Sequence, residues 1–293
     1  MSKSAIRTIG ITLGDPQGIG PEVIRKALLS PRLSKKCSFL IIGNHPQLRG
    51  LRIPKLNIPY KNPGEGSLKF LDHGITLIKG GIIDALVTAP LSKERVNQYH
   101  KGFRGHTEYL ADAFGVKRFD MMFISKHMRL SLLTRHVPLK DVPNMVTSRA
   151  VLNAIELLHE TLKVQFGIAH PRIAVLGLNP HAGEGGLLGK EEQRSIIPAI
   201  RKTAQNGMKV YGPFPADTFF IKECLYDGVI AMYHDQGLAP VKGKYFQDLV
   251  NFTAGLPFIR TSPVHGTAFD IAGKNRADPA SMIAAINLAC DLT

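Results

Sequence analysis

Short apolar runs recur along the chain, separated by longer segments in which apolar residues return every three or four positions. The runs have the length and β-branched content of buried strands, and they predict strands at 8–14, 39–43, 84–90, 120–125, 130–134, 172–178 and 228–234. The helical pattern is clearest at 148–163 and at 191–207, where Asn206 and Gly207 form a helix stop. Because strands and helices alternate, we expect an α/β fold with a mostly parallel sheet and helices on both faces.

The segment 45–68 interrupts this alternation with a high content of Pro, Gly and Lys, and we expect it to be a surface excursion. The sequence contains no internal repeat and no low-complexity segment. Its 293 residues suit one large α/β domain or two of moderate size, and the composition marks no boundary between them.

The composition is that of an ordinary globular protein, with 44% hydrophobic and 20% charged residues. No apolar run approaches the roughly 18–20 residues of a membrane span, and the stretch 1–20 lacks the apolar core of a signal peptide. Cys37, Cys224 and Cys290 are far apart in the sequence, which predicts neither a disulfide framework nor a thiolate zinc site. We therefore expect a cytoplasmic protein.

The net charge of +14 has two interpretations. One is a solvated basic surface, because the basic residues are scattered, with modest clusters at 25–36 and 117–135. The other is attraction of small polyanionic ligands, such as a phosphorylated substrate or a dinucleotide. Aromatic residues make up 7% of the chain and do not alternate with basic residues as a stacking surface would, which disfavours a nucleic-acid partner.

Three histidines follow three of the predicted strands. His136 follows the run that ends at 134, His181 follows the run that ends at 178, and His234 ends the last run. The carboxyl ends of parallel strands lie along one edge of a sheet, where ligands bind. Three imidazoles at that edge, with an open coordination position, would make a catalytic divalent-metal site. The alternative is that each histidine is a separate loop residue that caps a backbone group.

Two further segments combine glycine with a predicted helix start. In 105–115, His106 and Thr107 stand where free N–H groups favour a phosphate or carboxylate, although Thr107 could simply cap the helix. The segment 14–23 predicts a tight strand-to-helix turn, and it matches neither the dinucleotide fingerprint nor the P-loop.

Lys242, Asn251 and Arg260 follow His234 within one segment. They could be ordinary surface residues. They could also supply a point charge, an amide and a bidentate fork to a phosphate group. The residues alone leave both interpretations open.

A series of segments, taken in order, carries a family likeness: ITLGDPQGIGPEV, VTAPLSK, GHTEYLA, RHVPL, NPHAGEGGLLGKEE, GPFPADTFF, YHDQGLAPVK and VNFTAGLPFIRTSPVHGTAFDIAGK. Together they closely resemble the 4-hydroxythreonine-4-phosphate dehydrogenase (PdxA) family of pyridoxal phosphate (vitamin B6) biosynthesis, over nearly the whole chain. The segment HGTAFDIAGKNRADP also resembles the adenosine-binding loop of isocitrate and isopropylmalate dehydrogenases. The combination is specific, although no single segment would be.

The resemblance implies a two-domain α/β/α subunit of the isocitrate/isopropylmalate dehydrogenase type, with mostly parallel sheets and the active site in the interdomain cleft. The first domain would comprise residues 1–103 and 260–293. The second, residues 104–259, would carry the metal ligands and the dimer interface. The expected assembly is a homodimer whose active site is shared between the subunits, with no nucleic-acid or membrane partner.

The resemblance also assigns roles to single residues. His136, His181 and His234 fall on the family's three metal-ligand positions. The positions that contact substrate correspond to His106, Thr107, Lys242, Asn251 and Arg260. Asp217 falls on a carboxylate near the metal, and the candidates for the proton acceptor are Asp217 and Lys242. Contacts to the cofactor are expected at Gly185, His265, Gly266, Asp270 and Asn275.

The implied reaction is the NAD- and metal-dependent oxidation of 4-phosphohydroxy-L-threonine, followed by decarboxylation to 3-amino-2-oxopropyl phosphate. NADP is the alternative to NAD. Neutral imidazoles favour Zn²⁺, with Mg²⁺, Mn²⁺ and Co²⁺ as alternatives. Three other functions stay open: a family relative that oxidises another hydroxy acid such as 4-phospho-D-erythronate, a phosphate acyltransferase of the same fold, and a non-catalytic ligand-binding protein.

Overall fold

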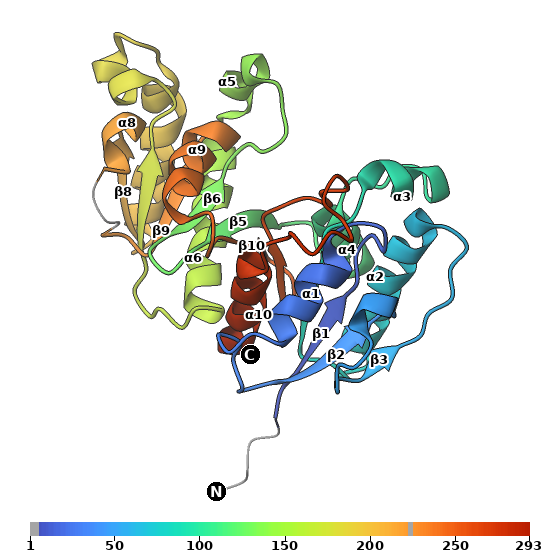
Figure 1. The fold of residues 1–293 in the computed structure, drawn as a ribbon. Helices are drawn as coiled ribbons and strands as arrows, with labels where there is room; N and C mark the ends of the chain where they lie inside the picture. The colour runs from blue at the N-terminus through green and yellow to red at the C-terminus, as the bar shows by residue number, and fades with distance from the viewer. Residues whose placement is uncertain (1–5, 222–224) are drawn as a thin grey trace, which may run out of the picture. The chain divides into compact units, whose positions relative to one another are not determined.

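The computed structural model of the chain describes residues 6–221 and 225–293 and shows an α/β protein (Figure 1). The chain forms two compact units: unit 1 is Met1–Lys117 with Gln247–Thr293, and unit 2 is Arg118–Phe246. None of the helices in the two described ranges is long and apolar enough to cross a membrane. The cytoplasmic location stays a prediction.

Unit 1 is built on a mostly parallel group of strands. They are β1 (Thr8–Thr12), β2 (Ser38–Ile42), β3 (Lys55–Leu56), β4 (Ala85–Thr88), β10 (Val250–Ala254) and β11 (Ile259–Pro263). Their order is β3-β2-β1-β4-β11-β10, in which β10 and β11 are antiparallel and the other neighbours are parallel. Aliphatic side chains such as Ile9, Ile11 and Val87 are fully buried and form the core of this unit.

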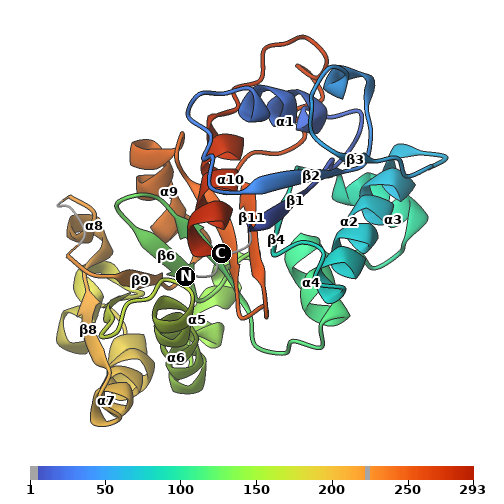
Figure 2. The ribbon, with the colours of Figure 1, turned by 90° about the horizontal axis from the view of Figure 1, so that it is seen from below.

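The helices of unit 1 cover both faces of its strands. They are α1 (Gly20–Leu28), α2 (Pro63–Lys79), α3 (Lys93–Tyr99), α4 (His106–Ala113) and α10 (Ala280–Leu292), with a short 3₁₀ helix η1 (Pro46–Leu48). The chain crosses from β1 to β2 through α1 in one direction and from β3 to β4 through α2 in the other. Because parallel crossovers are right-handed, α1 and α2 lie on opposite faces, and α10 packs beside α1 (Figure 2).

Unit 2 has its own strands and helices. The strands are β5 (Asp120–Ile124), β6 (Arg129–Leu132), β7 (Arg172–Leu176), β8 (Lys209–Phe214) and β9 (Gly228–Ala231), in the order β5-β6-β9-β7-β8. β5 and β6 are antiparallel, and the other neighbours are parallel. The helices are α5 (Val142–Met145), α6 (Ser148–Val164), α7 (Ile197–Gln205), α8 (Ala216–Phe219) and α9 (His234–Tyr245). Shorter turns are η2 (Leu139–Asp141), η3 (Pro180–Gly186) and the π-helical η4 (Glu192–Ile196).

The predicted elements are present. The seven predicted strands form as β1, β2, β4, β5, β6, β7 and β9, and the α/β class with mostly parallel strands is confirmed. The predicted helix at 148–163 is α6, which begins where the Thr147 side chain accepts a hydrogen bond from the Ala150 N–H at 3.2 Å. The predicted helix at 191–207 forms as η4 and α7, and it stops at Asn206.

The segment 45–68 is more than a surface excursion. It contains η1, β3 and the first residues of α2, and the side chains of Leu48 and Ile58 are buried. Pro46 and Pro63 each stand in the first turn of a helix, where the missing N–H of proline leaves no intrahelical bond unmade. Two of the four prolines in this segment therefore mark helix starts.

The boundaries of the two units differ from those expected at residues 103 and 259. Helix α4 packs within unit 1, where the Tyr109 hydroxyl donates a hydrogen bond to the Asp72 carboxylate of α2 at 2.6 Å. Residues 250–252 of strand β10 pair with β11. These contacts place residues 104–117 and 247–259 in unit 1.

Two cysteines that are distant in the sequence meet in unit 1. The Cys37 thiol lies 4.0 Å from the carbonyl oxygen of Cys290, and both are free thiols. Burial, reinforced by the Cys37 thiol, raises the pKa of Cys290, which therefore stays protonated at neutral pH. Cys224 lies outside the described residues.

Candidate active site

Parallel pairing in unit 2 brings three histidine-bearing segments to one edge of its strands. β9 lies between β6 and β7 and is parallel to both. His136 follows β6, His181 lies in η3 after β7, and His234 begins α9 after β9. The three histidines therefore follow the carboxyl ends of three adjacent strands.

Hydrogen bonds fix the end of β6 against the end of β9. The N–H and the hydroxyl of Thr134 both donate to the carbonyl oxygen of Met232, at 3.2 and 2.7 Å. Each of these two residues is two positions before a histidine. As a result, the rings of His136 and His234 lie with their centroids 5.6 Å apart and their planes inclined by 45°.

The spacing of these two rings suits the binding of one metal ion by both. An imidazole nitrogen binds Zn²⁺ at about 2.0–2.1 Å, which separates the centroids of two rings on the same ion by roughly 5–6 Å. Nδ1 of His234 is hydrogen-bonded to Asp235 Oδ1 at 2.6 Å, as metal-binding imidazoles are commonly oriented by a carboxylate. The pair borders a cavity of about 330 Å³ that Leu139 and Tyr233 also line.

His181 lies in a loop with unusual backbone geometry. In η3, φ is 53° at His181, 52° at Ala182 and 42° at Glu184, a left-handed region that residues other than glycine seldom occupy. The buried Glu192 carboxylate holds the loop by accepting the Asn179 N–H at 2.8 Å. Strained backbone of this kind clusters at ligand sites and switch segments.

His181 stays apart from the other two histidines. Across residues 6–221 and 225–293, no three His, Cys, Asp or Glu side chains gather into a group that could hold a metal ion. One chain thus presents a pair, His136 and His234, and a separate His181.

A largely buried carboxylate supports the segment that carries His136. Asp120 Oδ1 lies 3.4 Å from Arg135 Nη1, and its other oxygen accepts a hydrogen bond from the Ser131 hydroxyl. Burial raises the pKa of Asp120 to about 6, although Ser131 and Arg135 act in the opposite direction. Because Arg135 directly precedes His136, this ion pair anchors the segment that carries the metal-ligand candidate.

Unit 1 holds a buried cation without an acidic partner. Arg260, on β11, is 2% exposed. Its guanidinium donates to the Thr88 hydroxyl at 2.6 and 3.1 Å and to the Thr253 hydroxyl at 3.0 Å, and within the described ranges it forms no ion pair with a carboxylate. Burial lowers the pKa of Arg260 to about 9, and the charge of Glu108 opposes this shift. A desolvated guanidinium with neutral partners is suited to bind an anion.

Helix α4 starts beside this cation. Gly105 is its N-cap with a φ of 149°, and no side chain caps the first turn, so the alternative that Thr107 acts as the cap does not hold. The Thr107 hydroxyl instead lies 3.5 Å from the hydroxyl of Thr253, which binds Arg260. The uncapped N–H groups of the first turn give α4 a partial positive charge at this end.

His106, the first residue of α4, lies in the same electrostatic environment. Its pKa is well below the usual value, because burial is reinforced by the charges of Arg260 and Lys93. The ring is therefore neutral at pH 7, with one N–H to donate to a ligand.

The segment 264–278, the predicted cofactor loop, is tied to α1 at several points. The Ile19 N–H donates to the carbonyl oxygen of Thr267 at 2.9 Å. The Ala277 N–H donates to the buried Glu22 carboxylate at 2.7 Å. Lys26 Nζ donates to Glu22 at 2.9 Å and to the Ala277 carbonyl oxygen at 2.8 Å. The glycine-rich strand-to-helix turn therefore leads into a helix that holds this loop.

The predicted cofactor contacts differ in their surroundings. His265 Nδ1 is hydrogen-bonded to the Gly266 carbonyl oxygen at 3.1 Å, and its Nε2 is buried without a hydrogen-bond partner. Burial lowers the pKa of His265, so the orphaned nitrogen is an acceptor that a ligand could satisfy. Gly266, Asp270 and Asn275 are exposed, and Asn275 has a φ of 57°. Gly185 lies in η3 of unit 2.

Comparison with known proteins gives a family. The family model described as pyridoxal phosphate biosynthetic protein PdxA matches residues 33–289 of this chain. The chain belongs to this family. The predicted family is thereby confirmed, and relatives named as dehydrogenases over nearly the full chain confirm the prediction of an enzyme.

The similarity to PdxA-family relatives extends over the full length. The 4-hydroxythreonine-4-phosphate dehydrogenase of Aquifex aeolicus (strain VF5) is 40% identical over 98% of each chain, and that of Sulfurihydrogenibium sp. (strain YO3AOP1) is 38% identical over 96% of this chain and 97% of its own. A solved structure of a putative 4-hydroxythreonine-4-phosphate dehydrogenase from Salmonella typhimurium has a TM-score of 0.87 at 36% identity, covering 98% of this chain and 99% of that one. A branched-chain phosphotransacylase from Enterococcus faecalis V583, at 12% identity and a TM-score of 0.62, shares the fold.

The remaining PdxA-family positions lie as follows. Asn251 and Thr253 are two positions apart on β10 and so share one face, the face on which Thr253 binds Arg260. Asn251 Oδ1 is buried without a hydrogen-bond partner. Lys242 is partly exposed in the last turn of α9, and Asp217 is exposed in α8. Arg260, Asn251, Thr107 and His106 thus belong to unit 1, whereas Lys242 and Asp217 belong to unit 2.

The sequence did not predict the residues that position the candidate binding groups through hydrogen bonds. Thr88 and Thr253 bind the Arg260 guanidinium, and Glu22 binds the predicted cofactor loop. Their sequence context could have indicated this role, because each threonine is a polar residue in a buried run. Thr88 ends β4, and Thr253 lies within β10. A buried polar side chain needs a partner, and here the partner is the arginine.

Proposed function

We propose that the chain catalyses the NAD-dependent oxidation of 4-phosphohydroxy-L-threonine and its decarboxylation to 3-amino-2-oxopropyl phosphate, a step of pyridoxal phosphate biosynthesis. Relatives of nearly equal length that carry the name 4-hydroxythreonine-4-phosphate dehydrogenase support this proposal. The observation that carries it is the buried Arg260, held by threonine hydroxyls beside the uncapped start of α4. A phosphate dianion would satisfy both the guanidinium and the helix N-terminus.

The residues around Arg260 would bind the phosphate group of the substrate. Arg260 would present its fork to the phosphate oxygens, and the neutral His106 would donate one hydrogen bond. Thr107, Asn251 and Lys242 are the further predicted contacts. Because the phosphate is remote from the reacting carbon, its binding energy would orient the hydroxyl group for oxidation.

The pair of His136 and His234 fits a divalent metal ion, and we assign the third ligand position to His181. The ligand type favours Zn²⁺. When bound, the ion supplies a Lewis acid at the reacting oxygen, and NAD supplies the hydride acceptor. NAD would bind at His265, Gly266, Asp270, Asn275 and Gly185.

The chain must also move protons. Oxidation removes the hydroxyl proton, and Asp217 and Lys242 are the candidates to accept it. Decarboxylation then breaks the bond to the carboxylate carbon, carbon dioxide leaves, and the electron pair stays on the adjacent carbon until a proton is returned there. The same candidates are available for this return.

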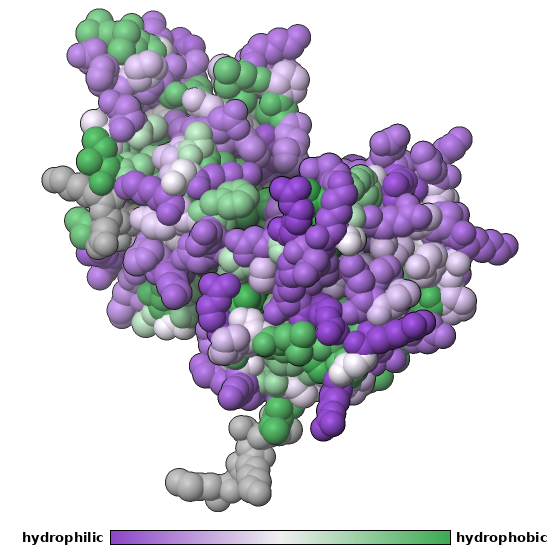
Figure 3. All heavy atoms as spheres, in the orientation of Figure 1, coloured by the Kyte–Doolittle hydropathy of each residue, from purple (hydrophilic) through white to green (hydrophobic). Residues whose placement is uncertain are grey.

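We further propose that two copies of the chain complete each site. Exposed leucines adjoin both histidine-bearing parts of unit 2: Leu187, directly after η3, is 83% exposed, and Leu139, which lines the cavity of His136 and His234, is 67% exposed. Figure 3 shows hydrophobic side chains gathered at the top of unit 2, above the helix labelled α8 in Figure 1 and at α5. Covering these side chains with a second copy would bury apolar surface and could bring His181 to the histidine pair.

A substrate panel tests the proposed reaction. NADH absorbance is followed with 4-phosphohydroxy-L-threonine, its phosphate-free form and 4-phospho-D-erythronate, and carbon dioxide is measured in parallel. We expect NADH and carbon dioxide in a one-to-one ratio from the first substrate, very slow turnover of the second, and loss of both signals on chelation. NADH without carbon dioxide, formed faster from 4-phospho-D-erythronate, would assign the chain to another hydroxy acid.

A further inference from the structure

Two charged side chains border the start of α4. Lys93 is the first residue of α3, and Glu108 lies in the first turn of α4. A side-chain carbon at Gly105 would lie 3.4 Å from Lys93 Nζ and 3.1 Å from Glu108 Oε2. Opposite charges therefore flank the same N-cap position, where the φ of 149° already favours glycine.

Lys93 and Thr88 both belong to the segment at the carboxyl end of β4. Thr88 ends β4 and binds Arg260, and Lys93 follows five positions later, after the Ser92 cap of α3. The charge of Lys93 is among the causes that lower the pKa of His106, after burial and Arg260. In the described parts of the chain, Lys93 Nζ has neither a hydrogen bond nor an ion pair, although it lies beside the Gly105 N-cap of α4.

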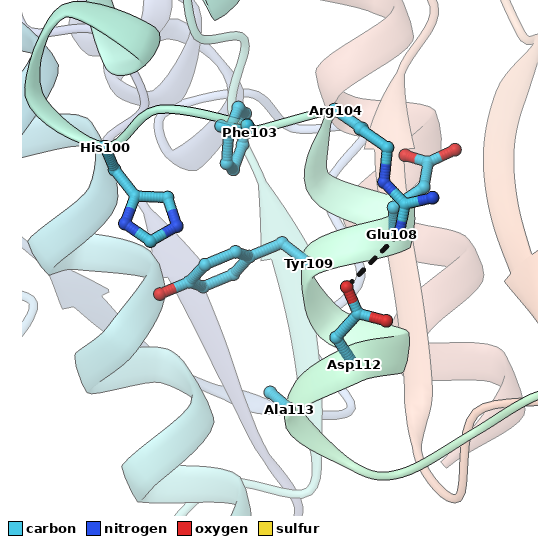
Figure 4. A pocket seen from close by; sticks show the side chains of 8 residues that line it. His100, Phe103, Arg104, Glu108, Tyr109, Asp112 and Ala113 are labelled. Carbon is cyan, nitrogen blue, oxygen red and sulfur yellow. Dashed lines mark hydrogen bonds and ion pairs between the residues drawn. The ribbon is translucent and has the colours of Figure 1, made fainter.

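Glu108 acts on the same site with the opposite sign. Its charge raises the pKa of Arg260. Glu108 also lines a pocket of about 300 Å³ beside α4, and Figure 4 shows that Arg104 in this pocket pairs with Asp112, at 3.3 Å, rather than with Glu108. The Glu108 carboxylate, which forms no ion pair within the described ranges, is left to act on the guanidinium.

We propose that Lys93 binds the phosphate group of the substrate together with Arg260, and that Glu108 weakens anion binding at this position. The proposal rests on the anion site of the proposed function. A phosphate at the first turn of α4 would attract the ammonium of Lys93 and be repelled by the carboxylate of Glu108. Lys93 is exposed, so its flexible side chain can turn toward the ligand.

Titration with inorganic phosphate tests both signs on the full-length protein. Calorimetry or the shift of the melting temperature gives the affinity of the wild type, Lys93→Met, Glu108→Gln and the control Lys101→Met, an exposed lysine between α3 and α4. We expect Lys93→Met to weaken phosphate binding about tenfold or more, Glu108→Gln to strengthen it by roughly two- to fivefold, and Lys101→Met to leave it unchanged. Lys93→Arg, which keeps the charge, should recover most of the affinity.

Equal phosphate affinity of Lys93→Met and the wild type would overturn the proposal, and so would a wild type that binds no phosphate. Steady-state kinetics separate a failure of the Lys93 proposal from a failure of the proposed function. We expect Lys93→Met to raise KM for 4-phosphohydroxy-L-threonine about tenfold while kcat and the KM for NAD change less than about twofold. If the wild type does not oxidise this substrate but the phosphate affinities shift as expected, the role of Lys93 stands and the proposed function fails. If the wild type oxidises this substrate, and Lys93→Met changes neither the phosphate affinity nor KM for the substrate, the proposed function stands and the role of Lys93 fails.

Discussion

A buried guanidinium that meets only hydroxyl groups costs free energy in the ligand-free protein, because threonine oxygens replace its hydration without neutralising its charge. Arg260 is in this state, between Thr88 and Thr253. An anion bound at Arg260 would offset this cost, and we therefore propose that the residue serves binding rather than stability. This distinguishes Arg260 from an arginine such as Arg118, which pairs with carboxylates at the surface.

Replacement of Arg260 should act mainly on substrate binding. We expect Arg260→Ala to raise KM for the phosphorylated substrate by roughly ten- to a hundredfold, or about 1.4–2.7 kcal/mol, in steady-state NADH assays. Arg118→Ala is the matched control and should leave KM unchanged. Circular dichroism shows whether Arg260→Ala still folds. A folded Arg260→Ala protein with the KM of the wild type would remove Arg260 from the site.

At the scale of elements, the sequence predicts best where a strand consists mainly of apolar and β-branched residues. β1, β7 and β9 are short runs that are buried over nearly all their residues, and their length and β-branched content favour strands over helices. β10 and β11 were not predicted, because Asn251, Thr253 and Arg260 place polar residues inside buried strands. β8 was missed because it contains Gly212 and Pro213 and is largely exposed. Local patterns fail where buried strands carry polar side chains that find their partners within the protein, since these residues interrupt the apolar pattern.

The candidate site was predictable only in part for the same reason. The strand-end histidines have a pattern that topology can interpret, because parallel strands share one edge. The contacts that hold the site depend on pairs distant in the sequence, such as Glu22 with Ala277, and no local pattern reports them. The left-handed backbone of η3, which carries His181, is likewise not reported by any local pattern.

Helix α1 should determine how well the predicted cofactor loop is held. Lys26 Nζ donates to Glu22 and to the carbonyl oxygens of Asn275 and Ala277. Lys26→Met removes these bonds, and we expect KM for NAD to rise about tenfold while KM for the phosphorylated substrate changes less than twofold. Lys36→Met, which breaks only an exposed ion pair, is the control. An unchanged KM for NAD in the Lys26 variant would separate this loop from cofactor binding.

The β5–β6 hairpin should show a pH dependence that comes from Asp120. Its pKa in the folded protein is about 6, mainly because of burial, and thus above the unfolded value of about 3.9. A raised folded pKa means that the folded state binds the proton more tightly. The stability that this gives is complete below about pH 4 and is lost as pH rises through about 6.

Urea unfolding between pH 4 and 7 measures this contribution. Relative to Asp120→Asn, the wild type should lose up to about 3 kcal/mol of unfolding free energy across this range. Asp112→Asn, at an exposed side chain that pairs with Arg104, should follow the wild type. Parallel curves for the wild type and Asp120→Asn would show that Asp120 titrates normally in the folded protein.

At the scale of the whole molecule, one chain brings two of its three metal-ligand candidates together and leaves the third apart. The rings of His136 and His234 are adjacent, and His181 belongs to no three-residue group within the described ranges. If a second copy supplies His181, each site of a dimer takes the pair from one subunit and the third ligand from the other. This arrangement makes a prediction that depends on which mutant subunits are combined.

Mixed dimers should therefore regain activity only in certain pairs. When inactive His136→Ala and His181→Ala proteins are unfolded together and reassembled, half of the random dimers contain one intact site, and we expect about a quarter of the wild-type activity. His136→Ala mixed with His234→Ala is the matched control. It should stay inactive, because both substitutions damage the pair that one subunit contributes, so no intact site can form. Metal content measured on the same samples should follow the activity. Recovery in the control mixture, or no recovery in the first, would contradict a site composed of His136 and His234 from one subunit and His181 from its partner.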